Sequence, residues 1–159
     1  MTNTLHAFFL LLTTLPIGAQ AHEPESLTLV TLADGNRGIK NAVDIGPPGP
    51  SQGDLFVFDQ PLMNEAHQDI GTNSGYCINT VPAVHSQCQW TLSFTDAAGK
   101  VEASIVVAGQ EHEIGTSVVA VIGSTGKYAG FTGEMSTQPK PDGTFSQTLK
   151  LVRQGPTPQ

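Results

Sequence analysis

The chain has 159 residues, of which only 13% are charged, and it contains 17 glycines and 11 prolines. This length suits one domain, and the many turn-forming residues are more typical of an all-β protein than of a helical one. Seven lysines and arginines stand against fourteen aspartates and glutamates, which gives a formal net charge of −7. Because the chain is acidic and has no basic cluster, we expect no nucleic-acid partner and no anionic membrane partner.

The first 21 residues predict a secretory signal peptide. Residues 7–15 form an apolar core that is too short to span a bilayer, and Ala19-Gln20-Ala21 gives the small-x-small pattern of a cleavage site. The segment lacks the lysine or arginine that usually precedes such a core. No other stretch is long and apolar enough to be a membrane span. We therefore expect a secreted or periplasmic protein that starts, after cleavage, at residue 22.

Eight short runs typical of β-strands follow. The clearest is 87–95, where Cys88, Trp90, Leu92 and Phe94 alternate with polar residues and so share one face of a strand. Clusters of Gly, Pro, Asp and Asn separate the runs and predict turns. The expected strands cover residues 26–33, 53–62, 70–80, 87–95, 101–108, 116–122, 128–136 and 144–152.

These strands form one predicted domain. Residues 22–52 supply the first strand and an irregular Pro/Gly-rich loop at 39–52, residues 53–152 supply the main strands, and residues 153–159 are a tail. Consecutive strands without a helical period predict an antiparallel meander, which either stacks as a sandwich or closes. Closure removes the exposed edges, and eight strands can enclose one small ligand. We therefore expect an all-β fold, an eight-stranded antiparallel up-and-down β-barrel.

The two cysteines predict a disulfide bond. Cys77 and Cys88 flank a plausible turn at residues 82–85, and a hairpin about this turn places them opposite each other on neighbouring strands. In an oxidising compartment a lone pair of cysteines is most simply a disulfide. The alternative is that one of them is a reactive thiol or a metal ligand.

In two groups of residues, the spacing between glycines and predicted strands, as well as the residue types, matches a known family. The first group is Gly53-Asp54-Leu55, Phe58, Leu62, Ile70-Gly71 and Gly75-Tyr76-Cys77. The second group is Ile122-Gly123-Ser124-Thr125-Gly126-Lys127-Tyr128, Gly130 and Gly133-Glu134. The first resembles the opening strands of the allene oxide cyclase barrel family. The second is similar to the glycine-rich signature that this family shares with plant dirigent proteins.

The resemblance covers residues 53–152 and implies an eight-stranded barrel with an apolar cavity. Family members use the cavity to steer a cyclisation, or in dirigent proteins the coupling of phenoxy radicals, without a cofactor. Dimers and trimers are common among them, so the resemblance also implies a homo-oligomer. Gln60 stands where allene oxide cyclases carry an asparagine, and Cys77 matches the cysteine of their third strand. The first strand here, residues 26–32, lacks the carboxylate and the amide that they place there.

Strand alternation then predicts which side chains face the cavity, given that Gln60 and Cys77 point inward. The residues expected to contact an apolar substrate are Phe56, Phe58, Leu62, Trp90, Leu92, Phe94 and, at the rim, Tyr128. The polar groups expected to orient the substrate, and so to serve catalysis, are Gln60, Asn79 and Tyr76. The alternative is that the aromatic side chains simply fill the barrel.

Two further features carry other chemistry. Glu111-His112-Glu113 falls in a predicted turn and is either a solvated turn or a metal site or acid/base pair at the barrel mouth. His22, as the mature N-terminus, is able to chelate copper with its amine and imidazole if His67, His85 or His112 supplies a second ligand. The function we expect is a secreted barrel that steers cyclisation, isomerisation or coupling of an apolar small molecule. The alternatives are a ligand carrier without turnover and a copper-binding protein.

Overall fold

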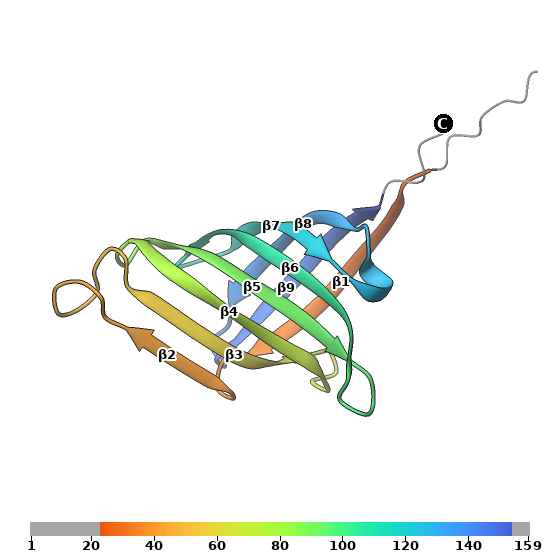
Figure 1. Cartoon of the computed structure of the whole chain (residues 1–159), viewed down its shortest axis with the longest axis horizontal. Helices are drawn as coiled ribbons and strands as arrows, with labels where there is room; N and C mark the ends of the chain where they lie inside the picture. Colours follow the sequence, from red (N-terminus) through yellow and green to blue (C-terminus); the bar gives the residue numbers. More distant parts are fainter. Residues whose placement is uncertain (1–22, 154–159) are drawn as a thin grey trace, which may run out of the picture.

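The computed structural model describes residues 23–153, so the predicted signal peptide, His22 and residues 154–159 lie outside the described residues. Antiparallel strands and one short 3-10 helix make up this part of the chain (Figure 1). Within it, no helix has the length and apolar character needed to cross a membrane. The elements are β1 (Glu25–Asp34), β2 (Ile39–Val43), β3 (Leu55–Met63), β4 (Asp69–Val81), β5 (His85–Thr95), β6 (Val101–His112), β7 (Ser117–Ser124), η1 (Gly126–Tyr128), β8 (Thr132–Pro139) and β9 (Thr144–Arg153).

The sheet closes because β1 and β2 share one position beside β3. β1 pairs along its whole length with β9, and its last residues also pair with β3 (Leu32 with Met63, Ala33 with Leu62). β2 continues in the same direction and pairs with the rest of β3, from Ile39–Asp59 to Val43–Leu55. The other strands pair with their neighbours in the chain. The predicted closed, eight-stranded antiparallel barrel is therefore confirmed.

β2 corrects the prediction that residues 39–52 form an irregular loop throughout. All five residues of β2 are exposed, so the strand has no alternation of buried and exposed positions by which the sequence could reveal it. Arg37 fixes the turn that precedes it, because its guanidinium forms ion pairs of 2.7 Å with both Asp34 and Asp69. The long-range pairing with β3, rather than local propensity, makes this segment a strand.

Two larger differences from the predicted boundaries concern the end of β6 and the segment around Tyr128. β6 runs on to His112, so Glu111 and His112 lie in a strand and not in a turn, because this part of β6 pairs with the start of β5. The sequence predicts one strand over residues 128–136, but Tyr128 ends the 3-10 helix η1 and β8 begins at Thr132. Gly126 and Gly130 adopt positive φ on either side of Tyr128, which bends the chain away from a strand.

The half of the barrel that contains η1 is filled with apolar side chains. Leu62, Leu92 and Ile105 are completely buried. The rings of Phe94 and Tyr128 pack edge to face with centroids 5.0 Å apart. η1 lies at the right-hand end of the barrel in Figure 1, and the loop between β2 and β3 lies at the left-hand end. This filled end leaves the other end of the barrel as the place for a ligand.

The predicted disulfide is confirmed: Cys77 and Cys88 are bonded and lie directly opposite each other on β4 and β5, with their Cα atoms 4.0 Å apart. The bond closes a loop between residues 11 apart in the chain. In the chain-entropy account, a loop of this length stabilises the folded state by about 3 kcal/mol.

Replacing both cysteines by alanine is therefore expected to lower the free energy of unfolding by about 3 kcal/mol, because the unfolded chain gains freedom. Urea denaturation of the variant and of the oxidised wild type measures the difference. Wild type treated with a thiol reductant is the control, and it should shift in the same direction. An unchanged urea midpoint in both samples would contradict the prediction.

Candidate functional site

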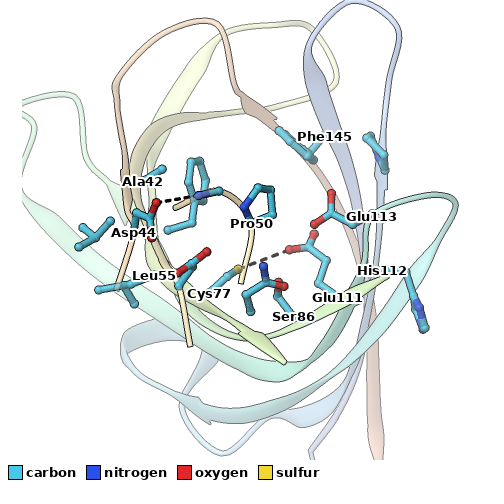
Figure 2. A pocket seen from close by; sticks show the side chains of 16 residues that line it. Ala42, Asp44, Pro50, Leu55, Cys77, Ser86, Glu111, His112, Glu113 and Phe145 are labelled. Atoms are coloured by element: carbon cyan, nitrogen blue, oxygen red, sulfur yellow. Dashed lines mark hydrogen bonds between the residues drawn. The ribbon is translucent and has the colours of Figure 1, made fainter. Parts of the chain in front are cut away.

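A cavity of about 690 Å³ opens at the end of the barrel where β3, β5 and β9 begin and where β2, β4, β6 and β8 end (Figure 2). Its volume falls in the range of small-molecule sites. Its apolar wall consists of Ala42, Val43, Pro50, Leu55, Phe56, Pro139 and Phe145. Its polar and charged lining consists of Asp44, Asp54, Asn79, Ser86, Glu111, His112 and Glu113.

A small inner chamber of about 70 Å³ continues the cavity toward the core, and the two share Phe56, Cys77, Glu111 and Phe145. Phe58 and Trp90 add aromatic walls, with ring centroids 6.4 Å apart. Buried polar side chains also line the chamber, and these are Gln60, Asn73, Thr137 and Gln147.

Hydrogen bonds fix part of this polar group. The hydroxyl of Thr31 donates to Oε1 of Gln147 over 3.0 Å, and Nε2 of Gln147 donates to Oδ1 of Asn73 over 3.4 Å. Gln60 is only 5% exposed and lies across from Asn73 on the neighbouring strand. The chamber is therefore aromatic on its sides and carries amides, an arrangement that can orient a polar atom of a bound molecule.

Glu111 is the only carboxyl residue that lines both the mouth cavity and the inner chamber in the described part of the chain. Strand alternation on β6 directs Glu111 into the opening and His112 away from it, and Glu113, just beyond the end of β6, also points into the opening (Figure 2). The structure does not support the alternative of an acid/base pair between His112 and a neighbouring carboxylate, because the two groups lie on opposite faces of the sheet. The ring of His112 instead lies edge to face with His85, 6.0 Å between centroids.

The carboxyl of Glu111 lies against the disulfide. Its Oε2 is 3.7 Å from Sγ of Cys77, as Figure 2 shows, and 3.4 Å from Sγ of Cys88. A disulfide sulfur carries no hydrogen, so it offers no donor to a carboxylate. Burial, and then the negative charge of Glu113, raises the pKa of Glu111 to about 7. Both protonation states of Glu111 are therefore present near neutral pH.

The same three residues are the one group of nearby metal-ligand side chains found among residues 23–153. Because Cys77 and Cys88 are joined to each other, their sulfurs are not the thiolates that bind metals. Glu111 alone then remains, and the arrangement does not form a metal site in the oxidised protein.

The loop between β2 and β3 forms one side of the opening. Asp54 holds this loop, since its carboxylate accepts hydrogen bonds from the backbone N–H of Ser51 and of Ile45 and from the Ser51 hydroxyl. These bonds, the one from the Ser51 N–H first, lower the pKa of Asp54. Asp44 accepts a bond from the N–H of Gly49. Two anionic side chains are thereby fixed at the rim.

The predicted site residues divide into three groups. Phe56, Phe58, Gln60 and Trp90 line the inner chamber, and Asn79 lines the mouth, so the structure brings these five together. Four others lie in the packed half and line neither space, contrary to the prediction, because apolar neighbours bury them: Leu62, Leu92, Phe94 and Tyr128. Tyr76 is also wrongly assigned: it is 41% exposed on the outer face, since its neighbour Cys77 points inward.

Two polar atoms at the site are buried and have no hydrogen-bond partner among the described residues. They are the side-chain oxygen of Asn79 and the indole nitrogen of Trp90. Buried polar groups are normally paired, and an exception calls for an explanation. A bound molecule is one source of the missing donor and acceptor.

The raised pKa of Glu111 predicts a pH dependence of stability. The ordinary value is 4.5 and the folded value about 7, so between these values the unfolded chain loses its proton first and stability falls as the pH rises. The loss is at most about 3 kcal/mol. Glu111→Gln should remove this fall and make the protein more stable than wild type at pH 8.

Urea denaturation from pH 4.5 to pH 8 measures the effect. Asp34, Asp54, Asp69 and Asp142 do not disturb it, because their pKa values lie below 3.8 and their stabilising effects are lost only as the pH falls below that value. Parallel curves for wild type and variant would contradict the prediction.

No protein-family model and no curated protein matches the chain, but solved structures do. Pyocyanin demethylase is 24% identical over 79% of this chain and 99% of that chain, with a TM-score of 0.64. A pterocarpan synthase dirigent protein is 14% identical over 93% of this chain and 99% of that chain, with a TM-score of 0.63. The fold is the dirigent-type barrel.

The Diels–Alderase AbmU from Streptomyces koyangensis shares this dirigent-type barrel, at 18% identity over 82% of this chain and 65% of that chain and with a TM-score of 0.60. The family resemblance read from the glycines is thus confirmed at the level of the fold. At these identities the comparisons establish the architecture of the dirigent-type barrel, and the chemistry must be argued from the residues at its mouth.

Proposed function

We propose that this protein binds an apolar, aromatic small molecule in the mouth of the barrel and steers its cyclisation, isomerisation or coupling, using Glu111 as acid and base and no cofactor. The observation that carries the proposal is an inward carboxyl in an aromatic cavity with a pKa of about 7. An acid/base catalyst works best when its pKa lies near the working pH. Structurally similar proteins include a pterocarpan synthase dirigent protein and a Diels–Alderase, which supports a fold suited to such reactions.

Each part of the cavity has a role in this proposal. Phe56, Phe58 and Trp90 hold the substrate in one conformer and exclude water, which lowers the entropic cost of an intramolecular reaction. Protonated Glu111 donates to an oxygen that develops negative charge, and the resulting carboxylate takes up the proton that the nucleophile releases. Gln60 and Asn79 orient polar atoms of the substrate.

We also propose that the protein works outside the cytoplasm, in a secreted or periplasmic form. The disulfide between Cys77 and Cys88 supports this, because structural disulfides persist in oxidising compartments. The predicted signal peptide points the same way.

Ligand binding is tested with the neutral fluorophore N-phenyl-1-naphthylamine. Wild type should bind it with a rise in emission, and Phe56→Asp at the mouth should weaken binding at least about tenfold. Val101→Asp is the matched control, because Val101 is exposed at the start of β6 near the filled end. Absence of binding by wild type would overturn the proposal.

Turnover is tested with a racemic aryl epoxide that carries a pendant hydroxyl. In the expected reaction the hydroxyl oxygen attacks an epoxide carbon and the carbon–oxygen bond breaks. Glu111 protonates the departing oxygen and receives the hydroxyl proton. Wild type should accelerate ring closure and enrich one enantiomer, and Glu111→Gln should do neither. Binding of the fluorophore with no acceleration in either protein would leave a carrier and overturn the catalytic part.

A further inference from the structure

The charges around the mouth cavity are all of one sign. Asp44, Asp54, Glu111 and Glu113 line it, and no lysine or arginine does. None of these four carboxyl groups takes part in an ion pair within residues 23–153. His112, the remaining ionisable residue of the lining, points away from the opening (Figure 2). The cavity therefore has a negative rim that no basic side chain of its lining neutralises.

Four of the seven basic residues in the described part of the chain are held in ion pairs, and the other three, Lys40, Lys100 and Lys140, form no ion pair there and do not line the cavity. Arg37 pairs with Asp34 and Asp69, and Arg153 pairs with Glu25. Lys127 pairs with Glu102, and Lys150 pairs with Glu134. A concave surface with low-dielectric walls focuses the field of such uncompensated charges and concentrates ligands of opposite sign.

A second observation points to the same ligand chemistry. The side-chain oxygen of Asn79 is buried at the mouth and accepts no hydrogen bond from the described residues. The carboxylates of Asp44 and Asp54 accept hydrogen bonds from the backbone N–H groups of Gly49 and Ser51, and neither is paired with a basic side chain of the described residues. The mouth is thus rich in acceptors and negative charge, so a ligand that supplies positive charge or donors satisfies it best.

The aromatic walls of the cavity are a third observation that bears on the ligand. The aromatic residues Phe56 and Phe145 line both the mouth and the inner chamber. The face of an aromatic ring attracts a cation, and a flat ring system packs well against such walls. The negative rim and the aromatic walls together select for charge and for shape.

From these observations we infer that the cavity selects planar aromatic cations and rejects aromatic carboxylates. The inference rests on the proposed function, since it names the substrate class of the same cavity. A fatty-acid or benzoate-type ligand would have to place its carboxylate beside Glu113, Asp44 and Asp54, which is electrostatically unfavourable.

The test compares three tricyclic probes of nearly equal shape by titration calorimetry at pH 8 and low salt. They are N-methylacridinium, which is a permanent cation, neutral acridine and anionic acridine-9-carboxylate. N-methylacridinium should bind at least about tenfold more tightly than acridine, and acridine-9-carboxylate at least about tenfold more weakly. The preference for the cation should shrink when sodium chloride is raised, because salt screens the rim.

Glu113→Gln should reduce the ratio of cation to neutral affinity by threefold or more. Glu65→Gln removes the same charge from the exposed turn between β3 and β4, and this control should leave the ratio unchanged. Equal affinity for cation and neutral probe, or tightest binding of the carboxylate, would overturn the inference but leave the ligand-binding cavity standing. Failure of all three probes to bind would overturn the proposed function as well.

Discussion

Glu111→Gln is expected to lower the rate at which the protein opens the ring of 5-nitrobenzisoxazole by at least about 100-fold. This flat aromatic probe loses one C–H proton to a base while its N–O bond breaks, so its reaction reports a carboxylate in an apolar cavity. General-base catalysis by one positioned side chain typically contributes such a factor. The amide of glutamine keeps the shape of the side chain and removes the basicity. Absorbance of the phenolate product measures the rate without knowledge of the natural substrate.

The pH profile separates this role from a merely structural one. The rate should rise with pH and reach half its maximum near pH 7, where Glu111 loses its proton. Glu113→Gln should move this midpoint to lower pH, because the negative charge of Glu113 helps to raise the pKa of Glu111. Glu65→Gln should leave the profile in place. Equal rates for wild type and Glu111→Gln would show that another group is the base.

Gly75→Ala is expected to lower the free energy of unfolding by about 2–3 kcal/mol or more. Gly75 on β4 lies directly opposite Trp90 on β5. A Cβ atom at Gly75 would overlap Cβ of Trp90 and the carbonyl oxygen of Gln89, and it would lie 2.6 Å from Cα of Trp90. Since part of this obstacle is backbone, a rotamer change cannot relieve it and the two strands must move apart.

The consequences of Gly75→Ala should reach the cavity, because Trp90 lines the inner chamber and the Cys77–Cys88 bond joins the same two strands. Fluorescence of Trp90, the only tryptophan of the chain, follows unfolding in urea. Gly123→Ala is the matched control, since a Cβ there meets Val106 only at 3.9 Å. Equal urea midpoints for the two variants would refute the overlap argument.

Strand positions could be predicted from the sequence wherever one face of a strand is buried. In β5 the buried side chains alternate with more exposed polar residues, so the sequence pattern predicts both the strand and its buried face. The buried residues are Cys88, Trp90, Leu92 and Phe94. In β2 all residues are exposed, and only the pairing with β3 defines the strand. The 3-10 helix η1, which ends at Tyr128, likewise depends on the positive φ of Gly126 and Gly130. These backbone conformations cannot be read from the sequence alone.

The candidate site could likewise be predicted only in part from the sequence. The sequence predicts a turn at Glu111, because the predicted strand 101–108 is followed by Gly109. The position of Glu111 nevertheless continues the inward series of Ile105, Val107 and Gly109, and this phase was the signal that could have revealed it. The pKa of its carboxyl depends on burial and on Glu113, which are properties of the folded barrel.

The filled end of the barrel has a kinetic consequence. Phe94, Tyr128 and Phe131 are buried near η1 in one apolar cluster with Leu92 and Ile105, and none of these residues lines the cavity. A molecule bound beside Glu111 must therefore leave by the opening through which it entered. Because the cavity has one opening, substrate can enter only after product has left. In the proposed reaction, a product that keeps its aromatic rings is therefore expected to compete with substrate for the cavity. If the proposed reaction takes place, we expect release of a product that stacks well against Phe56 and Phe145 to limit its rate.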